Sequence, residues 1–345
     1  MAYTTINKPS DYFNTKLYTG NQTANTAITG VGFQPDWTWI KRREINWHCL
    51  VDAVRGATKR ISSNETNTEV TDATAVTSLD SDGFTIGIDS NGYTNQNGGT
   101  YASWNWKANG AGSSNTDGSI TSTVSANTTS GFSIVSYTGT GSNATVGHGL
   151  GSVPKMMIIK NRTNTQGWAT YHHNQGAGNY IDLSSDNSGQ AGSSIFNNTT
   201  PTSSVFSVAT SGWTNDSGYN YIAYCFADVT GYSKFGSYIG NGNADGTFIY
   251  TGFKPAWFMV KQTNAAGNSW HILDNKRDSF NVMEKNLRAN LSNAEFDTGV
   301  DFDFLSNGVK MRNTDGASNN FGGSTYIYMA FAEEPLVGDN PCTAR

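Results

Sequence analysis

One strand-like stretch occurs three times in this chain of 345 residues. The copies read FQPDWTWIK, SVPKMMIIK and FKPAWFMVK and begin at residues 33, 152 and 253. In every copy the proline is followed six residues later by a lysine, and a tyrosine lies 17 residues before the proline. Equal spacing over this length indicates an internal repeat, because similar composition alone does not fix distances along a chain.

The similarity continues downstream of the lysine. A tryptophan follows in each copy, at Trp47, Trp168 and Trp270, and each copy closes on an aromatic strand, TYASWNWKA, NYIAYCFAD or TYIYMAFAE. The lysine and the first tyrosine of that strand are 60, 61 and 65 residues apart. A Gly-containing hairpin signal precedes each closing strand. We therefore expect three tandem modules of roughly 100 residues each.

These spacings set the expected domain boundaries. The segment 109–130, NGAGSSNTDGSITSTVSANTTS, is small and polar, which predicts a linker. The second and third modules are joined almost directly. The expected organisation is an N-terminal arm at 1–10, modules at 11–108, 131–229 and 231–335, and a tail at 336–345.

The composition favours β structure. Hydrophobic residues make up 36% and aromatic residues 12% of the chain, and the remainder is rich in the Asn, Ser, Gly and Thr typical of strands and tight turns. DWTWIK, MMIIK and WFMVK are apolar on both strand faces, which predicts a central covered strand that starts at the proline. We expect Trp37 and Trp39 to fill a sandwich interior. The predicted fold is all-β, with three tandem β-sandwich modules of jelly-roll, lectin-like type.

No long segment has a helical period, although VMEKNLRANLS at 282–292 is compatible with a helical turn or two. The net charge of −5 argues against a nucleic-acid partner. The N-terminus has no export signal pattern, and no stretch is long and apolar enough to span a membrane. Cys49, Cys225 and Cys342 are too far apart and too irregular for a disulfide framework or zinc site, so we expect Cys49 and Cys225 to be buried small hydrophobes.

The strongest chemical constellation appears in WHCLVDAVRGA and WHILDNKRDSF. It places a histidine, an aspartate and an arginine close together twice: His48, Asp52 and Arg55 in the first copy, and His271, Asp274 and Arg277 in the third. Acid/base chemistry is one interpretation. The second copy has His172 and His173 without the acid or the arginine, and an Asp–Arg pair after a strand more often fixes a turn. We favour the structural interpretation.

Paired carboxylates are the next candidates, because glycosidases need two at a defined separation. Glu333 and Glu334 are adjacent and would point to opposite strand faces. Asp301 and Asp303 share a face but have no counterpart in the other copies. No nucleophile elbow, phosphate-binding loop or zinc-protease motif is present. We therefore predict no catalytic residue.

Metal binding is equally poorly supported. SLDSDGF and NGNADGT contain acidic turns but lack the ligand spacing of a calcium loop. His148 is isolated in a Gly-rich loop, and His172 and His173 would lie on opposite faces of a strand. We predict neither a metal site nor a cofactor.

Aromatic residues outside the repeated strands are the remaining candidates for function. Tyr93, Trp213, Tyr219 and Phe321 lie among Asn, Gly and Ser in loops. Such loops can stack on sugars or contact a protein, and these four residues are our predicted ligand-binding set. The alternative is that they cap the ends of the sandwiches, since large aromatic side chains gain most from burial.

Several segments resemble a module repeated in structural proteins of tailed bacteriophages, especially marine phages of the cyanophage type. They are KPSDYFNTKLYTGN, ITGVGFQPDWTWIKRR, DAVRGATK, SLDSDGFTIG and VSANTTSGFSIVSYTGTGSNATVGHGLGSVPKMMIIKNR. The third module fits more loosely, because it has YIGNG in place of YTGTG and lacks the GHGLG glycines. Proteins of this kind are described as tail-fibre-like or uncharacterised virion proteins with lectin-like sandwiches.

The resemblance implies a virion surface protein, made in the host cytoplasm, that belongs to a tail fibre or similar appendage and contributes to host-surface attachment. A capsid or tail decoration protein without receptor binding is the alternative, and a glycan depolymerase is the less favoured third. The implied partners are other virion proteins, a host-surface glycan or protein, and further copies of the chain, as in trimeric appendages. We expect the arm at 1–10 to dock on another virion protein.

Overall fold

The computed structural model describes residues 3–297, 299, 301–314, 316–338 and 342. Its regular structure is almost entirely antiparallel β, so the predicted all-β sandwich fold is confirmed. Within the described ranges no helix is long and apolar enough to cross a bilayer. The helical segments are η1 (Pro9–Asp11), α1 (Ser193–Phe196) and η2 (Gly316–Asn320).

The first repeat, residues 11–108, forms a six-stranded sheet in the order β1-β9-β3-β4-β5-β6 and a three-stranded sheet in the order β2-β8-β7. Apolar side chains from both sheets form the interior between them. The strands are β1 (Phe13–Thr19), β2 (Thr26–Thr29), β3 (Trp37–Arg42), β4 (Cys49–Asp52), β5 (Gly56–Ile61), β6 (Val70–Thr71), β7 (Val76–Asp80), β8 (Gly83–Ile86) and β9 (Thr100–Trp106).

The second repeat, residues 131–229, has the sheet order β12-β19-β14-β15-β16-β17, extended by β10 and β11 from before the repeat, and a small sheet of β13 and β18. The strands are β10 (Ser113–Asn115), β11 (Ser122–Asn127), β12 (Phe132–Thr138), β13 (Ala144–Gly147), β14 (Met156–Asn161), β15 (Trp168–His172), β16 (Asn179–Asp182), β17 (Gln190–Ala191), β18 (Val205–Val208) and β19 (Asn220–Phe226).

The third repeat, residues 231–335, has the orders β20-β27-β22-β23-β24 and β21-β26-β25. The larger sheets of all three repeats thus share one strand order. The strands are β20 (Ser233–Ile239), β21 (Phe248–Tyr250), β22 (Phe253–Gln262), β23 (His271–Asp274), β24 (Leu287–Arg288), β25 (Phe302–Leu305), β26 (Gly308–Met311) and β27 (Thr325–Pro335).

Two expectations about segments were wrong. The expected linker 109–130 contains β10 and β11, because Ser122, Val124 and Ala126 alternate toward the second interior although the segment is polar on average. The segment 282–292 contains β24 and no helix. The N-terminal arm packs on its own chain, where Ile6 is buried and the Tyr3 hydroxyl donates to the carbonyl of Gly252 at 2.7 Å.

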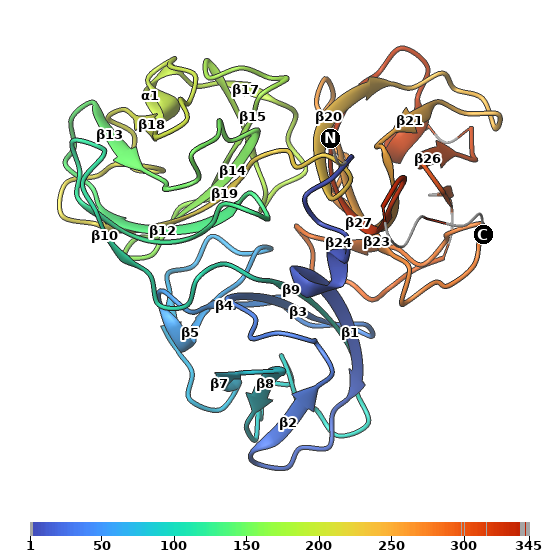
Figure 1. Cartoon of the computed structure of the whole chain (residues 1–345), viewed down its shortest axis with the longest axis horizontal. Helices are drawn as coiled ribbons and strands as arrows, with labels where there is room; N and C mark the ends of the chain where they lie inside the picture. Colours follow the sequence, from blue (N-terminus) through green and yellow to red (C-terminus); the bar gives the residue numbers. More distant parts are fainter. Residues whose placement is uncertain (1–2, 298, 300, 315, 339–341, 343–345) are drawn as a thin grey trace.

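The three pairs of sheets surround a common centre, with the larger sheets facing inward and the smaller sheets outward (Figure 1). One hydrophobic core contains residues of all three repeats, including Trp37, Trp106, Phe226, Trp257 and Phe331. The indole of Trp106 lies 5.7 Å from that of Trp257 and 5.6 Å from the ring of Phe331. The repeats are therefore packed as one body around an aromatic centre.

The repeated strand is central and buried on both faces, as predicted. Its two faces, however, belong to different cores. Ile40 points into the first sandwich, whereas Trp37 and Trp39 point into the common centre, so the expectation that these tryptophans fill a sandwich interior is wrong. Cys49 and Cys225 are buried free thiols, as predicted.

Candidate functional site

The Asp–Arg pair of the first repeat lies where β4 ends, facing the second repeat. Arg55 Nε donates to Asp52 Oδ2 at 2.5 Å, and neither side chain has exposed surface. The other oxygen of Asp52 accepts the backbone N–H groups of Val54 and Arg55, which fixes the turn into β5. Burial opposes the charge on Arg55, but Asp52, Tyr224 and Glu69 outweigh it and raise the pKa of the guanidinium above its ordinary value.

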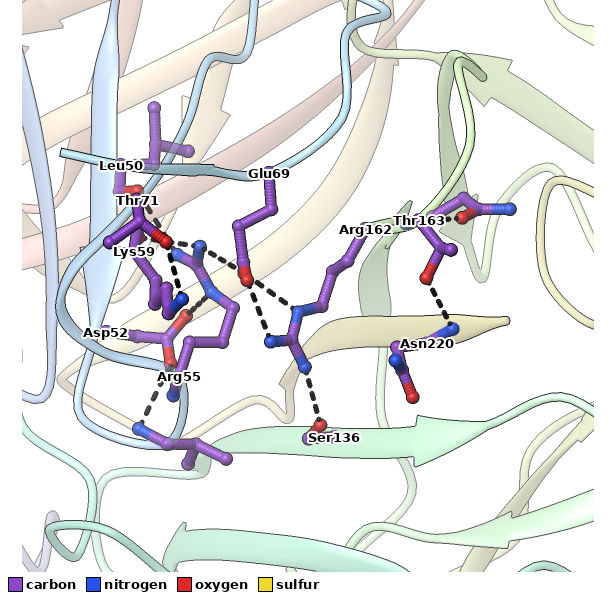
Figure 2. A network of polar contacts seen from close by, with 12 residues as sticks. Leu50, Asp52, Arg55, Lys59, Glu69, Thr71, Ser136, Arg162, Thr163 and Asn220 are labelled. Carbon is purple, nitrogen blue, oxygen red and sulfur yellow. Dashed lines mark hydrogen bonds and ion pairs between the residues drawn. The ribbon is translucent and has the colours of Figure 1, made fainter. Parts of the chain in front are cut away.

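This pair also connects two repeats (Figure 2). The Tyr224 hydroxyl of the second repeat donates to Asp52 Oδ2 at 2.7 Å. Glu69 accepts from Arg55 of its own repeat and from Arg162 of the second, with distances of 3.3 and 2.8 Å. We call this set, Asp52, Arg55, Glu69, Arg162 and Tyr224, the first joint.

The third repeat contacts the first through an equivalent set. Arg277 Nε donates to Asp274 Oδ2 at 2.5 Å, and Glu295 pairs with both Arg277 and Arg43 of the first repeat. Trp104 Nε1 donates to Asp274 Oδ2 at 3.0 Å, in the place of the Tyr224 hydroxyl. This set, the closing joint, brings together residues near opposite ends of the chain.

We call the contact between the second and third repeats the middle joint. In this joint a neutral histidine takes the place of the charged aspartate. His172 lies opposite Met156 in the strand pairing, as Asp52 lies opposite Trp37, so His172 occupies the aspartate position. Its Nε2 lies 3.4 Å from the carbonyl oxygen of Tyr328 in the third repeat. Burial lowers the pKa of His172 to about 3, which keeps the ring neutral.

The sequence interpretation of these residues as structural agrees with this geometry. Asp52, Arg55, Asp274 and Arg277 have no exposed side-chain surface, so a substrate has no access to them. What the sequence did not reveal is the partner: each pair holds a neighbouring repeat rather than only its own turn.

The repeated lysines serve the same joints. Each Nζ donates to two carbonyl oxygens, one of them in another repeat: Lys160 reaches Thr66, Lys261 reaches Asp186 and Lys41 reaches Ser292. Burial lowers the pKa of Lys41 to about 7 and those of Lys160 and Lys261 to about 8. Two acceptors match the two N–H groups of a neutral amine, so the joints accommodate uncharged lysine.

These lysines predict a stability that rises with pH. Between about pH 8 and the ordinary lysine pKa of 10.5, the unfolded chain binds more protons than the folded chain, so raising the pH favours folding. We expect the midpoint of thermal unfolding to rise from pH 7 to 9 in the wild type and to rise less in Lys160→Met. Lys8→Met, at an exposed ion pair, is the control, and its unfolding midpoint should change with pH as that of the wild type does. If the midpoint rises equally with pH in all three proteins, the lowered pKa of Lys160 is contradicted.

The repeated tryptophans complete two of the joints. Trp168 Nε1 donates to the Ser62 carbonyl at 3.0 Å, and Trp270 Nε1 donates to the Asp182 carbonyl at 3.1 Å, in each case from one repeat to the preceding one. In the closing joint this role passes to His48, whose Nε2 lies 3.0 Å from the carbonyl oxygen of Arg288 while Nδ1 accepts from Trp39 Nε1.

Trp47 is thereby released from the joint and lies partly exposed at the surface. Its indole stacks on the ring of Tyr93, with centroids 6.0 Å apart and an interplanar angle of 25°. The guanidinium of Arg60 lies 4.0 Å from the centroid of the same tyrosine. Trp47, Arg60 and Tyr93 form a cluster that we call the first-repeat platform.

The structure places the four predicted ligand-binding aromatics in three separate loops. Tyr93 belongs to the first-repeat platform. In the second repeat, Trp213 packs edge-on against Tyr180 at 5.2 Å, and Tyr219 is partly buried against the same interior. Phe321 of the third repeat is 56% exposed. They come from three different repeats, and of the four only Tyr93 stacks on a partly exposed tryptophan, Trp47.

Sequence reasoning missed a buried asparagine that recurs beneath these loops in each repeat. Asn95, Asn215 and Asn320 are buried, and each accepts a backbone N–H from the loop that follows the leading tyrosine of its repeat. The signal was available, because each asparagine lies six residues before the first tyrosine of its closing strand. The hydroxyl of that tyrosine, in turn, accepts the backbone N–H of the residue that directly follows the asparagine.

Two of the other candidate carboxylates form ion pairs elsewhere. Asp303 pairs with Arg312 at 3.2 Å, and Glu333 pairs with Lys254 at 3.1 Å. Over the part of the chain that the structure describes, no cluster of three His, Cys, Asp or Glu residues has the arrangement needed to hold a metal ion.

Comparison with known families gives one match. The model of DUF7483, a domain of unknown function, matches residues 8–335 and so spans all three repeats and every joint. Searches of curated proteins and of solved structures gave no match. The chain therefore belongs to the DUF7483 family.

Proposed function

We propose that this chain is a surface component of a bacteriophage virion, part of a tail fibre or similar appendage, and that it contributes to attachment to the host surface. The sequence resemblance supports the virion assignment. The observation that carries the attachment role is the first-repeat platform. It is the place where a tryptophan that is buried in the other two repeats lies at the surface.

The platform is held in place by hydrogen bonds between the Asn46 side chain and the neighbouring backbone. Asn46 adopts a positive φ of 104°, and its side-chain amide donates to the carbonyl of Asn91 at 2.6 Å. The Asn46 side-chain oxygen accepts the N–H of Trp47. A prearranged aromatic surface binds with less loss of conformational entropy than a mobile one.

The surroundings of the platform suit recognition of a sugar or a protein. A small hollow of about 40 Å³ is lined by Trp47 and Arg60 together with Glu65, Asn67 and Val70. Val70 is 44% exposed. Aromatic faces stack on apolar sugar faces or anchor a protein contact, while carboxylate, amide and guanidinium groups supply hydrogen bonds.

The three joints and the aromatic centre support the same proposal from another direction. A recognition surface on a particle must keep its orientation under load, and packed repeats joined by buried hydrogen bonds, with buried ion pairs at two of the three joints, form a rigid support. The same rigidity suits the alternative function, a decoration protein that stabilises the particle without binding a receptor. A glycan depolymerase is the least supported function, because Asp52 and Asp274 are enclosed in ion pairs.

Trp47→Ala tests the attachment role. We expect adhesion of the purified protein to host cells to fall about tenfold or more, since an aromatic hot spot contributes about 2 kcal/mol or more to binding and about 1.4 kcal/mol corresponds to tenfold. The free energy of unfolding should change by no more than about 1 kcal/mol, because the side chain loses one stacking contact. Phe280→Ala, at a side chain that is 78% exposed, is the control and should leave adhesion unchanged.

Antibody labelling separates the alternatives. If antibody against this chain labels an appendage of the intact particle and blocks adsorption to cells, the attachment function is supported. Labelling spread over the capsid or tail without an effect on adsorption would favour the decoration protein. A purified particle that lacks the chain would overturn both.

A further inference from the structure

The three repeats differ in what covers the outer edge of the first strand of the larger sheet. In the second repeat, β11 pairs antiparallel with the edge of β12, with Thr123 opposite Ser136, Ser125 opposite Ile134 and Asn127 opposite Phe132. The segment that contains β11 comes from outside the repeat, and it closes an edge that the repeat itself leaves open.

The equivalent strand of the first repeat is β1. Phe13 lies opposite Trp106 in β9 as Phe132 lies opposite Phe226 in β19, which aligns β1 with β12. On its other side β1 has no neighbouring strand among the described residues. The first sandwich therefore lacks the strand that β11 supplies to the second.

The backbone of β1 has free hydrogen-bonding groups along this edge. The Tyr12 carbonyl and the Gly20 N–H bond toward the β9 side. Because directions alternate along a strand, Phe13, Thr15 and Leu17 direct their N–H and C=O groups to the open side. Within the described ranges no hydrogen bond to these groups is present.

The corresponding edge of the third repeat is partly closed by residues of the second repeat. The N–H of Phe235 in β20 donates to Asp228 Oδ1 at 2.9 Å, and His173 Nε2 lies 3.0 Å from the carbonyl oxygen of Phe235. Among the three equivalent edges, β1 alone has no such contact within the residues described.

A groove runs along the free edge of β1. A cavity of about 180 Å³ between the first and third repeats is lined by Phe13, Thr15 and Asn275, and a more open hollow of about 360 Å³ continues past Lys16 and Leu17. Thr15 Oγ1 and Asn275 Oδ1 are buried in it without a hydrogen-bond partner among the described residues. Thr15 and Asn275 are only 6% and 4% exposed.

The charges in the groove restrict the occupant. Lys16 and Lys276 line the open part, and neither belongs to an ion pair within the described chain, whereas Glu333 and Glu334 line the inner cavity. Lysine on an edge also hinders pairing with a second uncharged or basic edge. A strand that carries an acidic side chain would satisfy both lysines.

We infer that the free edge of β1 accepts an extended segment of a partner protein as an additional antiparallel strand. The segment has small or β-branched residues that alternate toward the sandwich, as β11 has, and an acidic residue near Lys16 and Lys276. Main-chain hydrogen bonds provide the affinity in this binding mode, and the groove walls provide the specificity. This inference does not depend on the attachment function.

The chain supplies its own probe. Residues 120–128, ITSTVSANT, include β11, and a labelled synthetic peptide of this sequence can be compared with ITSDVSANT by fluorescence anisotropy against the full-length protein. We expect saturable binding of both peptides, with the acidic peptide bound at least tenfold more tightly. Absence of binding by both would overturn the inference.

Two variants locate the site. Thr15→Pro removes an outward-facing N–H without removing a bond to β9, and proline is tolerated on an edge strand in this position. We expect it to weaken both peptides at least tenfold with an unchanged melting temperature. Lys276→Glu should weaken only the acidic peptide.

The same variants separate the occupants. Full binding by Thr15→Pro would overturn the inference, because the peptide would then lie elsewhere. Should Thr15→Pro itself unfold, Lys276→Glu still decides, since equal loss for both peptides contradicts a charge-matched strand. If neither peptide binds and the wild type self-associates through this edge, the occupant is a second copy of the chain and not a partner protein.

Discussion

Replacement of Arg55 by methionine is expected to lower the free energy of unfolding by about 3 to 5 kcal/mol, because removal of one member of a buried ion pair leaves the other charge uncompensated. Asp52 would remain without exposed surface, and among the described residues the Tyr224 hydroxyl would be its one remaining side-chain donor. Chemical denaturation followed by tryptophan fluorescence measures the change, and the midpoint should fall without a change in slope.

The second repeat provides the control for this experiment. The double variant Asp52→His, Arg55→Gln copies His172 and Gln175, which occupy the matching positions in the middle joint. It removes both charges together, so we expect it to be clearly more stable than Arg55→Met. If the single variant is as stable as the double variant, the ion pair does not hold the first joint. Arg277→Met should repeat the single-variant result in the closing joint.

Replacement of Trp39 by alanine is expected to cost about 3 to 5 kcal/mol of stability, the usual range for deletion of a large buried aromatic side chain. The indole is 1% exposed and lies 5.7 Å from Trp37 and 5.9 Å from Trp104. Its Nε1 also donates to His48 Nδ1 at 2.7 Å, so the substitution leaves a buried acceptor without its donor.

Trp47→Ala is the matched control, because it removes the same side chain from the surface. Thermal unfolding of both variants should separate them by several degrees, with Trp47→Ala close to the wild type. A Trp39→Ala protein that melts with the wild type but no longer adheres to cells would contradict the core assignment and transfer the recognition role to this tryptophan.

Much of the fold was predictable from the repeat. Equal spacing identified which residues are equivalent, and strands that are apolar on both faces predicted buried central strands. β11 was missed because Ser, Thr and Asn dominate its segment, and average polarity hid the alternation of Ser122, Val124 and Ala126. A strand of an antiparallel sheet with one covered face needs only half of its residues to face a core.

The candidate site was less predictable. Tyr93 was identified from its loop, but Trp47 was noted only as a repeated tryptophan, and its counterparts Trp168 and Trp270 are almost completely buried. Its release depends on His48, which forms the joint contact in its place. The acceptor of that contact is the carbonyl oxygen of Arg288, 240 residues away, so no local sequence pattern could predict it.

The sequence by itself determined that three copies of one β unit follow each other, that their central strands are buried, and that a lysine and a tryptophan recur at matching places. Only the tertiary structure decided what those residues hold. Both faces of β3 are apolar, so alternation cannot tell a sandwich interior from a contact between repeats. The lysines likewise donate to carbonyl oxygens 94, 75 and 251 residues away. Backbone acceptors of this kind carry no side-chain signature, and their positions depend on how the three repeats pack.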